Sequence, residues 1–468
     1  MIYSKREGSS IDEALPGVRP AKKIKVVSLE GLTNSDAADD LPVDPPSAVH
    51  LLSLRDLLDF TSLDDEVAIT NRFDMIARVL MHEHQLVVHC EGAETAFEIQ
   101  EMEFYLQKDE CYEDPFTHGS EEQKVSGRWY VPSFIIFCQY ADENIMKRYF
   151  HRAPRRSNDA SRSSASLTAY RGGTRKGLDL TIGGLPPRTI SSYFFVSQST
   201  NSLLVPNVAD VQGDRHGPRS TEFVRGGILL RGLRSLTKDG AIDTNLKKNS
   251  VYGPSLLVDR ILNLNGASSI SELVEVKWGG DTSALDPPSA SSTSSRTSYL
   301  YLKPVTCSIP SLPKIHKSPR IGLDLSHPGI TIPNDQSTLI DCHPRIRFLP
   351  KMLRYYTRPR ELTKGRAQSI YGFIHTALAT RFDFRDDNYL SRDKAFRAIL
   401  TEAIGVKDAL VEKYLWEYDA GRKEGLKHLA LCVGPGGKGA ADSPTSYLKM
   451  MGAFDAALLL PGAQKDHS

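Results

Sequence analysis

The features that this sequence lacks exclude several classes of protein. No apolar run in its 468 residues approaches the roughly 20 residues of a membrane span. Its first residues hold no apolar signal region, so we do not expect secretion. Its 6 cysteines are scattered without a C-x-x-C pair, which argues against a disulfide framework and a structural zinc site. We therefore expect a protein of a reducing compartment, with no membrane partner and no bound metal.

Common catalytic signatures are also missing. The GGKG of residues 436–439 is not a phosphate-binding P-loop, because no Ser or Thr follows the Lys and no strand precedes it. No Ser-His-Asp, dinucleotide-binding or metal-hydrolase pattern rises above chance. The stretch HEHQLVVHC (82–90) is rich in His, but ordinary core and surface histidines explain it better than a metal site. We expect chemistry that needs neither a cofactor nor a metal.

The charge is nearly balanced overall but unevenly placed. The net charge is +1, yet residues 147–179 hold nine Lys or Arg against Asp159 and Asp179, and residues 345–366 hold eight against Glu361. Each stretch therefore carries a net charge of +7. Local basic density in a neutral protein can form a phosphate-binding face. Two solvated loops are the alternative interpretation.

Composition divides the chain into three parts. Residues 1–50 are polar and aperiodic, so we expect a disordered arm, in which the basic run 19–25 resembles a nuclear import signal. Residues 51–376 mix helix and strand patterns, and residues 377–468 have the pattern of a helical C-terminal region, with helices across 393–405 and 409–431. The middle part is interrupted at 131–148, 281–297 and 330–344. We interpret 281–297 as a low-complexity loop, and the other two as retained introns of a eukaryotic gene or as ordinary loops.

Apolar periodicity predicts the main elements of the middle part. A helix is expected over 70–82, beginning at Thr70 or Asn71. The run QLVVH (85–89) predicts a strand that pairs, through a turn in 90–95, with a strand over 97–106. Residues 225–233 predict another strand, and residues 252–266 a helix capped by Ser255 and stopped by Gly266. The side chains expected to face inward from the two helices are Phe73, Ile76, Ala77, Leu80, Leu257, Val258, Ile261 and Leu262.

Two glutamates stand out in the strand FEIQEMEFYL (97–106). Strict alternation places Phe97, Ile99, Glu101, Glu103 and Tyr105 on one face, so two acids share an apolar face. In an apolar pocket, burial and mutual repulsion raise one carboxyl pKa, which gives a usable acid or base. A buried salt-bridge network or an exposed edge strand are the alternatives. The candidate cations for such a network are Arg231, Arg175 and Lys176.

The stretch YRGGTRKG (170–177) is the second candidate site. Gly172 and Gly173 let the backbone approach a phosphate, and Arg171, Arg175 and Lys176 supply positive charge. A glycine hairpin with a solvated basic face is the alternative. The aromatic residues Trp129, Tyr130, Tyr355 and Tyr356 could form platforms for bases, although a core role is more common for such residues.

The order of several motifs resembles that of the alkyladenine (3-methyladenine) DNA glycosylases. The matching segments are EMEFYL (101–106), a His in DPFTH (114–118), SGRWY (126–130), GILLRGL (227–233), the GPSLLVDRILNLNG helix, RIGLDL (320–325) and LRYY (353–356). The resemblance covers roughly residues 65–375. It implies an α+β fold, in which helices pack around a curved and mostly antiparallel sheet.

The resemblance also implies roles for individual residues. Glu103 matches the general base that activates water, Tyr105 and His118 match groups that pack around a flipped base, and Arg231 matches an arginine near the nucleotide backbone. Thr181 stands where the family has a pocket asparagine. Thr174 stands near the position of the tyrosine that the family wedges into the duplex. These last two departures put duplex base flipping in doubt, because an intercalated side chain offsets the cost of unstacking.

Together these observations predict the recognition of a damaged purine in DNA. Hydrolytic cleavage of its N-glycosidic bond would use Glu103 as the base and Glu101 as its structural partner. Arg231, which is expected to pair with one of the two acids, provides the link between them. We expect a nuclear monomer. The alternatives are a nucleic-acid-binding protein without catalysis that keeps the fold, and an enzyme that acts on another small substrate with Glu101, Glu103 and the GGTRKG loop.

Overall fold

The computed structural model describes residues 52–117, 121–131, 176–184, 224–237, 249–285, 296–305, 312–331, 342–380 and 390–459. All of these residues belong to the compact unit that begins at Leu52. The expected arm over 1–50, its basic run 19–25 and most of the three interrupting segments lie outside the described residues. The structure therefore leaves the predictions made for these segments open.

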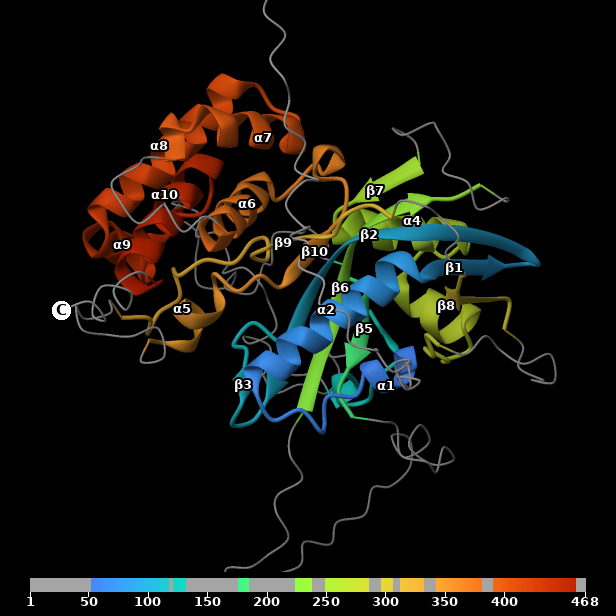
Figure 1. Ribbon diagram of the computed structural model, residues 1–468. Helices are drawn as coiled ribbons and strands as arrows, with labels where there is room; N and C mark the ends of the chain where they lie inside the picture. Colours follow the sequence, from blue (N-terminus) through green and yellow to red (C-terminus); the bar gives the residue numbers. More distant parts are fainter. Residues whose placement is uncertain are drawn as a thin grey trace, which may run out of the picture. The chain divides into compact units, whose positions relative to one another are not determined.

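A curled, antiparallel, ten-stranded sheet organises the fold (Figure 1). Its main path is β4-β5-β6-β2-β1-β8, in which the long strands β2 (Ala93–Lys108) and β6 (Val224–Ser235) lie side by side. The expected class, α+β with a curved antiparallel sheet and packed helices, is confirmed. The other strands are β1 (His84–Cys90), β3 (Tyr112–Glu113), β4 (Trp129–Tyr130), β5 (Asp179–Ile182), β7 (Ser250–Tyr252), β8 (Ser298–Pro304), β9 (His316–Ser318) and β10 (Arg354–Tyr356).

The predicted hairpin between β1 and β2 is present. The two strands pair antiparallel from Leu86 opposite Phe97 to Cys90 opposite Ala93. Glu91 and Gly92 form the tight connection with φ angles of 49° and 82°, a left-handed conformation that glycine adopts without strain. This hairpin leads the chain into the strand that carries Glu101 and Glu103.

Helix α2 (Glu66–His82) packs its apolar stripe on the sheet, where it contacts β1 and β2. Its predicted inward residues are buried, and the ring of Phe73 lies 4.6 Å from that of Phe104. The helix begins earlier than Thr70 or Asn71, which corrects the sequence prediction. Asp65 is the N-cap, because its carboxylate accepts a hydrogen bond from the backbone N–H of Ala68 over 2.8 Å.

Helix α4 (Pro254–Leu264) packs beside β6, and its four predicted inward residues are buried. The N-cap is Gly253, followed by Pro254 in the first turn, so the expected Ser255 cap is wrong. The hydroxyl of Ser255 instead binds the main chain of Lys176, accepting from its N–H over 3.3 Å. A π-helix, η5 (Glu272–Lys277), follows α4 in the chain.

The C-terminal helices share a core with one edge of the sheet. Asp455 accepts hydrogen bonds of 2.6 Å from the hydroxyls of Tyr371 and Tyr418, which belong to different helices. Arg354 of β10 donates to the hydroxyl of Ser369 over 3.0 Å. The five longer helices of this part are α6 (Arg366–Thr380), α7 (Lys394–Ile404), α8 (Asp408–Glu424), α9 (Leu426–Cys432) and α10 (Pro444–Phe454). The shorter helical segments of the described chain are α1 (Leu54–Leu57), α5 (Pro344–Phe348), η2 (Glu121–Lys124), η7 (Pro359–Glu361), η9 (Leu390–Arg392), η10 (Pro435–Gly437) and η11 (Asp455–Leu459).

Candidate functional site

A β-bulge interrupts the strand that carries the two glutamates. The ladder between β2 and β6 shifts register between Ile99 and Glu101, and again between Glu101 and Met102. An extra residue reverses the side to which the following side chains point. Strict alternation from Phe97 to Tyr105 therefore does not hold. The acids need not share a face with Phe97 and Ile99, which removes the conflict between acids and an apolar face.

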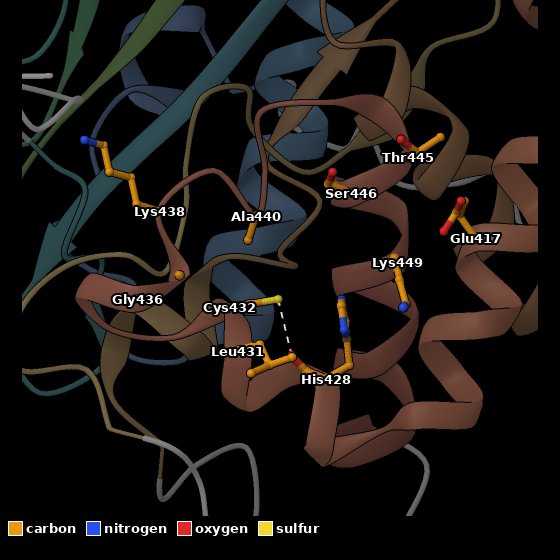
Figure 2. A pocket seen from close by; sticks show the side chains of 11 residues that line it. Glu417, His428, Leu431, Cys432, Gly436, Lys438, Ala440, Thr445, Ser446 and Lys449 are labelled. Atoms are coloured by element: carbon orange, nitrogen blue, oxygen red, sulfur yellow. Dashed lines mark hydrogen bonds between the residues drawn. The ribbon is translucent and has the colours of Figure 1, made fainter. Parts of the chain in front are cut away.

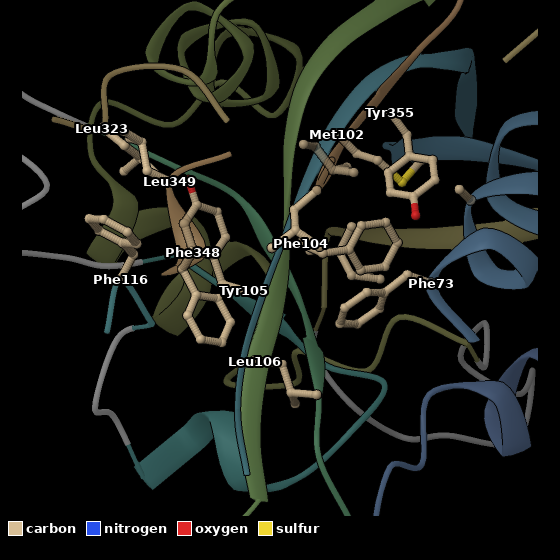
Figure 3. Close-up of a cluster of buried hydrophobic side chains, with 14 of the residues drawn as sticks. Phe73, Met102, Phe104, Tyr105, Leu106, Phe116, Leu323, Phe348, Leu349 and Tyr355 are labelled. Carbon is tan, nitrogen blue, oxygen red and sulfur yellow. The ribbon is translucent and has the colours of Figure 1, made fainter. Parts of the chain in front are cut away.

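Beyond the bulge, β2 has one polar and one apolar face. Phe104 points toward Phe73 of α2, whereas Tyr105 lies on the other side of the strand (Figure 3). Glu103 is directly opposite Arg354 on one side and Leu229 on the other, and Leu229 is in turn opposite Asp179. Because directly paired residues point to the same side of a sheet, these four side chains form a row on the polar face. We call them the sheet row.

Arg231 links the two glutamates. Its Nε lies 3.4 Å from Oε1 of Glu101, and its Nη1 lies 3.2 Å from Oε2 of Glu103. Arg231 was expected to pair with one of the two acids, but it pairs with both. Burial lowers the pKa of Arg231, but the negative charges of Glu103 and Glu101 outweigh burial, so its pKa is raised. The arginine is therefore held as a permanent cation inside the fold.

Among the residues that the structure describes, three donors bind Glu103, which has no exposed surface. Oε2 accepts from the hydroxyl of Tyr105 over 2.8 Å as well as from Arg231, and Oε1 accepts from the backbone N–H of Ile321 over 2.7 Å. A carboxylate offers about four acceptor sites, so one site on Oε1 remains. Burial, and then the charge of Glu103, raises the pKa of Tyr105, which therefore stays a donor.

Two further arginines, Arg354 and Arg320, contact residues of this network. Arg354 donates from Nε to Glu101 over 2.6 Å. Arg320 lies with its guanidinium carbon 4.4 Å from the ring centre of Tyr105, and its Nη2 donates to Asp114 over 3.0 Å. Both guanidinium groups are fully buried. The candidate catalytic pair is thus part of a buried network of carboxylates and arginines, as one of the sequence alternatives proposed.

Thr181 has a structural role. Its hydroxyl donates to the carbonyl oxygen of Val125 over 2.6 Å and accepts from the N–H of Arg128 over 2.9 Å. These bonds fix the segment that enters β4, so the hydroxyl is occupied. Tyr130 is half-buried and lies opposite Asp179 in the β4–β5 ladder. Of these two base-binding candidates, only Tyr130 is directly paired with a member of the sheet row.

Of the described residues in the two basic stretches, Arg354 joins the glutamate network, whereas Lys176 binds another acid. Lys176 donates from Nζ to Asp259 of α4 over 2.8 Å, away from the glutamates. In the second basic stretch, Arg354 binds Glu101 and Arg358 binds Glu98, each over 2.6 Å. Part of the positive charge of this stretch is therefore neutralised by acids within the fold. The remaining predicted site residues, His118, Arg171, Gly172, Gly173 and Arg175, and Thr174 with them, lie outside the described residues.

Asp179 forms part of the sheet row, although the sequence did not predict it as a site residue. Its side chain is 4% exposed, and its Oδ1 is buried without a hydrogen-bond partner. Burial, and then the negative charge of Glu103, raises the pKa of Asp179 from 3.8 to about 7. A single Asp in LDLTI carries no recognisable motif. The only available signal was an acid inside a strand of apolar residues.

A cavity of about 340 Å³ lies in the C-terminal helical part, away from the sheet row. Figure 2 shows its lining from α8, α9, α10 and the loop before α10. Within it, Lys449 and His428 both bind Glu424, and burial raises the pKa of the Cys432 thiol to about 11. The cavity therefore offers no reactive thiolate near pH 7.

Comparison with known proteins adds no assignment. No family model matches the chain, and no curated protein matches it. Across the described ranges, no three His, Cys, Asp or Glu side chains gather in a set able to hold a metal ion. Among the helices that the structure describes, none is both long and apolar enough to cross a membrane.

Proposed function

We propose that the chain recognises a damaged purine in DNA and hydrolyses its N-glycosidic bond, in the manner of the alkyladenine DNA glycosylases that its motif order resembles. The supporting observation is the convergence of Glu103, Tyr105 and Arg231, which are linked directly by hydrogen bonds of 2.8 and 3.2 Å. These residues come from two strands and are up to 128 positions apart in the sequence.

The chemistry of this constellation fits a hydrolytic role. Glu103 keeps one acceptor site on Oε1, which could take a proton from water, while Arg231 and Tyr105 fix its orientation. Alkylated purines that carry a positive charge leave easily, so a base and a cage of aromatic groups could suffice without a metal or cofactor. Because Glu103 has no exposed surface, the segment at Ile321 has to move before water can reach Oε1.

This burial also favours a second candidate function, the binding of nucleic acid without catalysis. A fully buried and fully oriented carboxylate is what a structural network requires. In that case Glu101, Glu103 and Arg231 hold the sheet together, and cations at the surface bind the phosphates. The protein is proposed to act as a nuclear monomer under either function.

An excision assay separates the two candidates. Full-length protein is incubated with duplex and single-stranded DNA that contains 3-methyladenine or 7-methylguanine, and released base is measured. The proposed enzyme should release base, and Glu103→Gln should reduce turnover at least ~100-fold, the scale of general-base catalysis. Glu94→Gln is the matched control, since Glu94 pairs with Tyr301 and Lys303 at the surface. No release by the wild-type protein would refute catalysis on these bases.

Binding is measured on the same DNA at several salt concentrations. A phosphate-binding face should make log affinity fall linearly with log salt, and Arg175→Ala and Lys176→Ala should flatten the slope by about one unit each. Salt-dependent binding without release of base would support the second candidate. Binding that does not respond to salt, or no binding at all, would remove both.

A further inference from the structure

Two arginines lie against the ring of Phe116, and they use their hydrogen-bond donors differently. The guanidinium carbon of Arg320 is 5.2 Å from the ring centre, and that of Arg345 is 4.7 Å from it. Arg320 donates within the fold, to both carboxylate oxygens of Asp114 and to the carbonyl oxygen of Phe104. Among the described residues, the guanidinium group of Arg345 makes no hydrogen bond or ion pair. A guanidinium group that stacks through its face keeps the N–H groups at its edge available for an anion.

Further donors lie beside Arg345. Its backbone N–H donates to Nδ1 of His343 over 3.1 Å, which places the proton of the neutral imidazole on Nε2 and makes Nε2 a donor. Arg347 and His327 lie close enough for their charges to act on His343. The Nε of Arg347 is buried without a hydrogen-bond partner in the part of the chain that the structure describes. We call Arg345, Arg347 and His343 the cation group.

The positive charge of the cation group is only partly neutralised. Burial lowers the pKa of Arg345, and the negative charges of Asp324 and Asp114 do not offset this effect. Burial, and then the charges of the three neighbouring side chains, also lowers the pKa of His343. Cations that gather without matching acids repel one another, and a bound anion relieves this repulsion.

The cation group adjoins the candidate site. Arg320 lies against the ring of Tyr105, at 4.4 Å, as well as against that of Phe116. The next residue along the chain donates its N–H to Glu103 over 2.7 Å. Only the side chains of Arg320 and Phe116 therefore separate Arg345 from Tyr105 along this series of contacts. A strand whose base approaches Glu103 would carry a phosphate close to Arg345.

We propose that the cation group binds one backbone phosphate of the nucleic acid, next to the nucleotide whose base approaches Glu103. The inference deepens the proposed function and rests on its nucleic-acid partner, which both candidate functions share. Arg345 donates to two phosphate oxygens through the edge of its guanidinium group, and Arg347 and Nε2 of His343 donate to the same phosphate. Such a contact fixes the position of the strand and carries no sequence information.

The test measures the affinity of the full chain for labelled DNA at several salt concentrations. One phosphate contact contributes about 0.9 to the slope of log affinity against log salt for a duplex, and about 0.7 for a single strand. The double variant Arg345→Gln, Arg347→Gln should reduce the slope by this amount, and the affinity at low salt by about tenfold. Arg78→Gln is the control, since Arg78 is exposed on α2 and should contribute to neither.

Two single variants keep the test informative if the double variant melts at a lower temperature. Arg347→Gln leaves the stack of Arg345 on Phe116 intact and should still lower the affinity. Arg345→Lys keeps the charge but loses the planar fork of donors, so it should weaken binding with little change of slope.

The possible outcomes separate this inference from the proposed function. If the wild-type protein binds DNA in a salt-dependent way and the double variant keeps the wild-type slope, the cation group does not contact the strand, and the proposed function stands. If the wild-type protein does not bind DNA, the proposed function fails, and this inference with it. Inorganic phosphate at constant ionic strength tests the other source of a phosphate group. A rise in melting temperature that the double variant lacks, together with unchanged DNA binding, would assign the cation group to free phosphate and overturn the contact with the strand.

Discussion

Arg354 donates a hydrogen bond from Nε to Oε1 of Glu101 over 2.6 Å, and neither side chain is more than 3% exposed. Glu101 also lies 3.4 Å from Arg231, so one carboxylate compensates two buried guanidinium groups. Removing one member of a buried ion pair is costly, because an uncompensated charge remains in a medium of low polarity.

Glu101→Gln should therefore lower the free energy of unfolding by about 3 kcal/mol. Glu94→Gln is the matched control, since the ion pair of Glu94 with Lys303 is exposed and should contribute no more than about 1 kcal/mol. Denaturant unfolding of both variants measures the difference. Equal stabilities would show that the network is dispensable to the fold.

The crossing of α8 and α10 depends on two glycines. A methyl group on Gly452 would overlap with the carbonyl oxygen of Tyr418, and one on Gly421 with that of Lys449. Alanine stabilises an isolated helix by about 1 kcal/mol relative to glycine. Gly452→Ala should nevertheless destabilise the protein by at least about 2 kcal/mol, because the helices have to separate.

Gly436→Ala provides the control for this prediction. No atom lies within 4 Å of the position that its methyl group would take, so its thermal melting temperature should change by no more than about 2 °C. A Gly452→Ala protein that melts at or above the wild-type temperature would show that the two helices do not pack closely through these glycines.

The corrected start of α2 is also testable. Asp65 caps the helix through the N–H of Ala68, so Asp65→Ala should cost about 1 kcal/mol of stability. Asn71 lies one turn inside the helix, where Asn has a lower helix propensity than Ala. Asn71→Ala should therefore be neutral or slightly stabilising. If Asn71→Ala destabilises the protein more than Asp65→Ala in urea unfolding, the helix begins at Thr70 or Asn71, as the sequence predicts.

Local patterns predicted more of this fold than contacts between distant segments. The inward faces of α2 and α4 follow from apolar spacing, and the pairing of β1 with β2 follows from their short turn. The bond between Glu101 and Arg354 joins residues 253 positions apart and depends on how β10 pairs with β2, which no local signal determines. The bulge in β2 was missed although the sequence marks it, because its large apolar residues stand at odd positions before the bulge and at even positions after it: Phe97, Ile99, Met102, Phe104 and Leu106.

The candidate site was likewise only partly predictable. The two acids of one strand and the arginine of another predicted that Arg231 would pair with Glu101 or Glu103, whereas it binds both. Asp179 was missed because its importance comes from its neighbours. It is directly opposite Leu229, is acted on by the charge of Glu103, and lies beside two glycines. Each of these relationships arises only once the strands are in register.

The last prediction concerns the stability of the fold as a function of pH. Burial and Glu103 raise the pKa of Asp179 from 3.8 to about 7, so the folded protein keeps a proton that the unfolded chain loses near pH 4. Between these values the folded state binds more protons than the unfolded state, and its stability falls as pH rises. Three pKa units correspond to about 4 kcal/mol, lost between pH 4 and pH 7.

Asp179→Asn removes this titration. The difference in unfolding free energy between Asp179→Asn and wild type should therefore shift in favour of the variant by about 4 kcal/mol from pH 4 to pH 8. Asp455→Asn should shift in the same direction over a narrower range, because burial raises the pKa of Asp455 to about 6. Asp56→Asn should show the opposite sign, since Ser53 lowers the pKa of Asp56, whose contribution is lost as pH falls below about 4. If the difference for Asp179→Asn does not change with pH, Asp179 does not hold its proton in the folded state between pH 4 and pH 7.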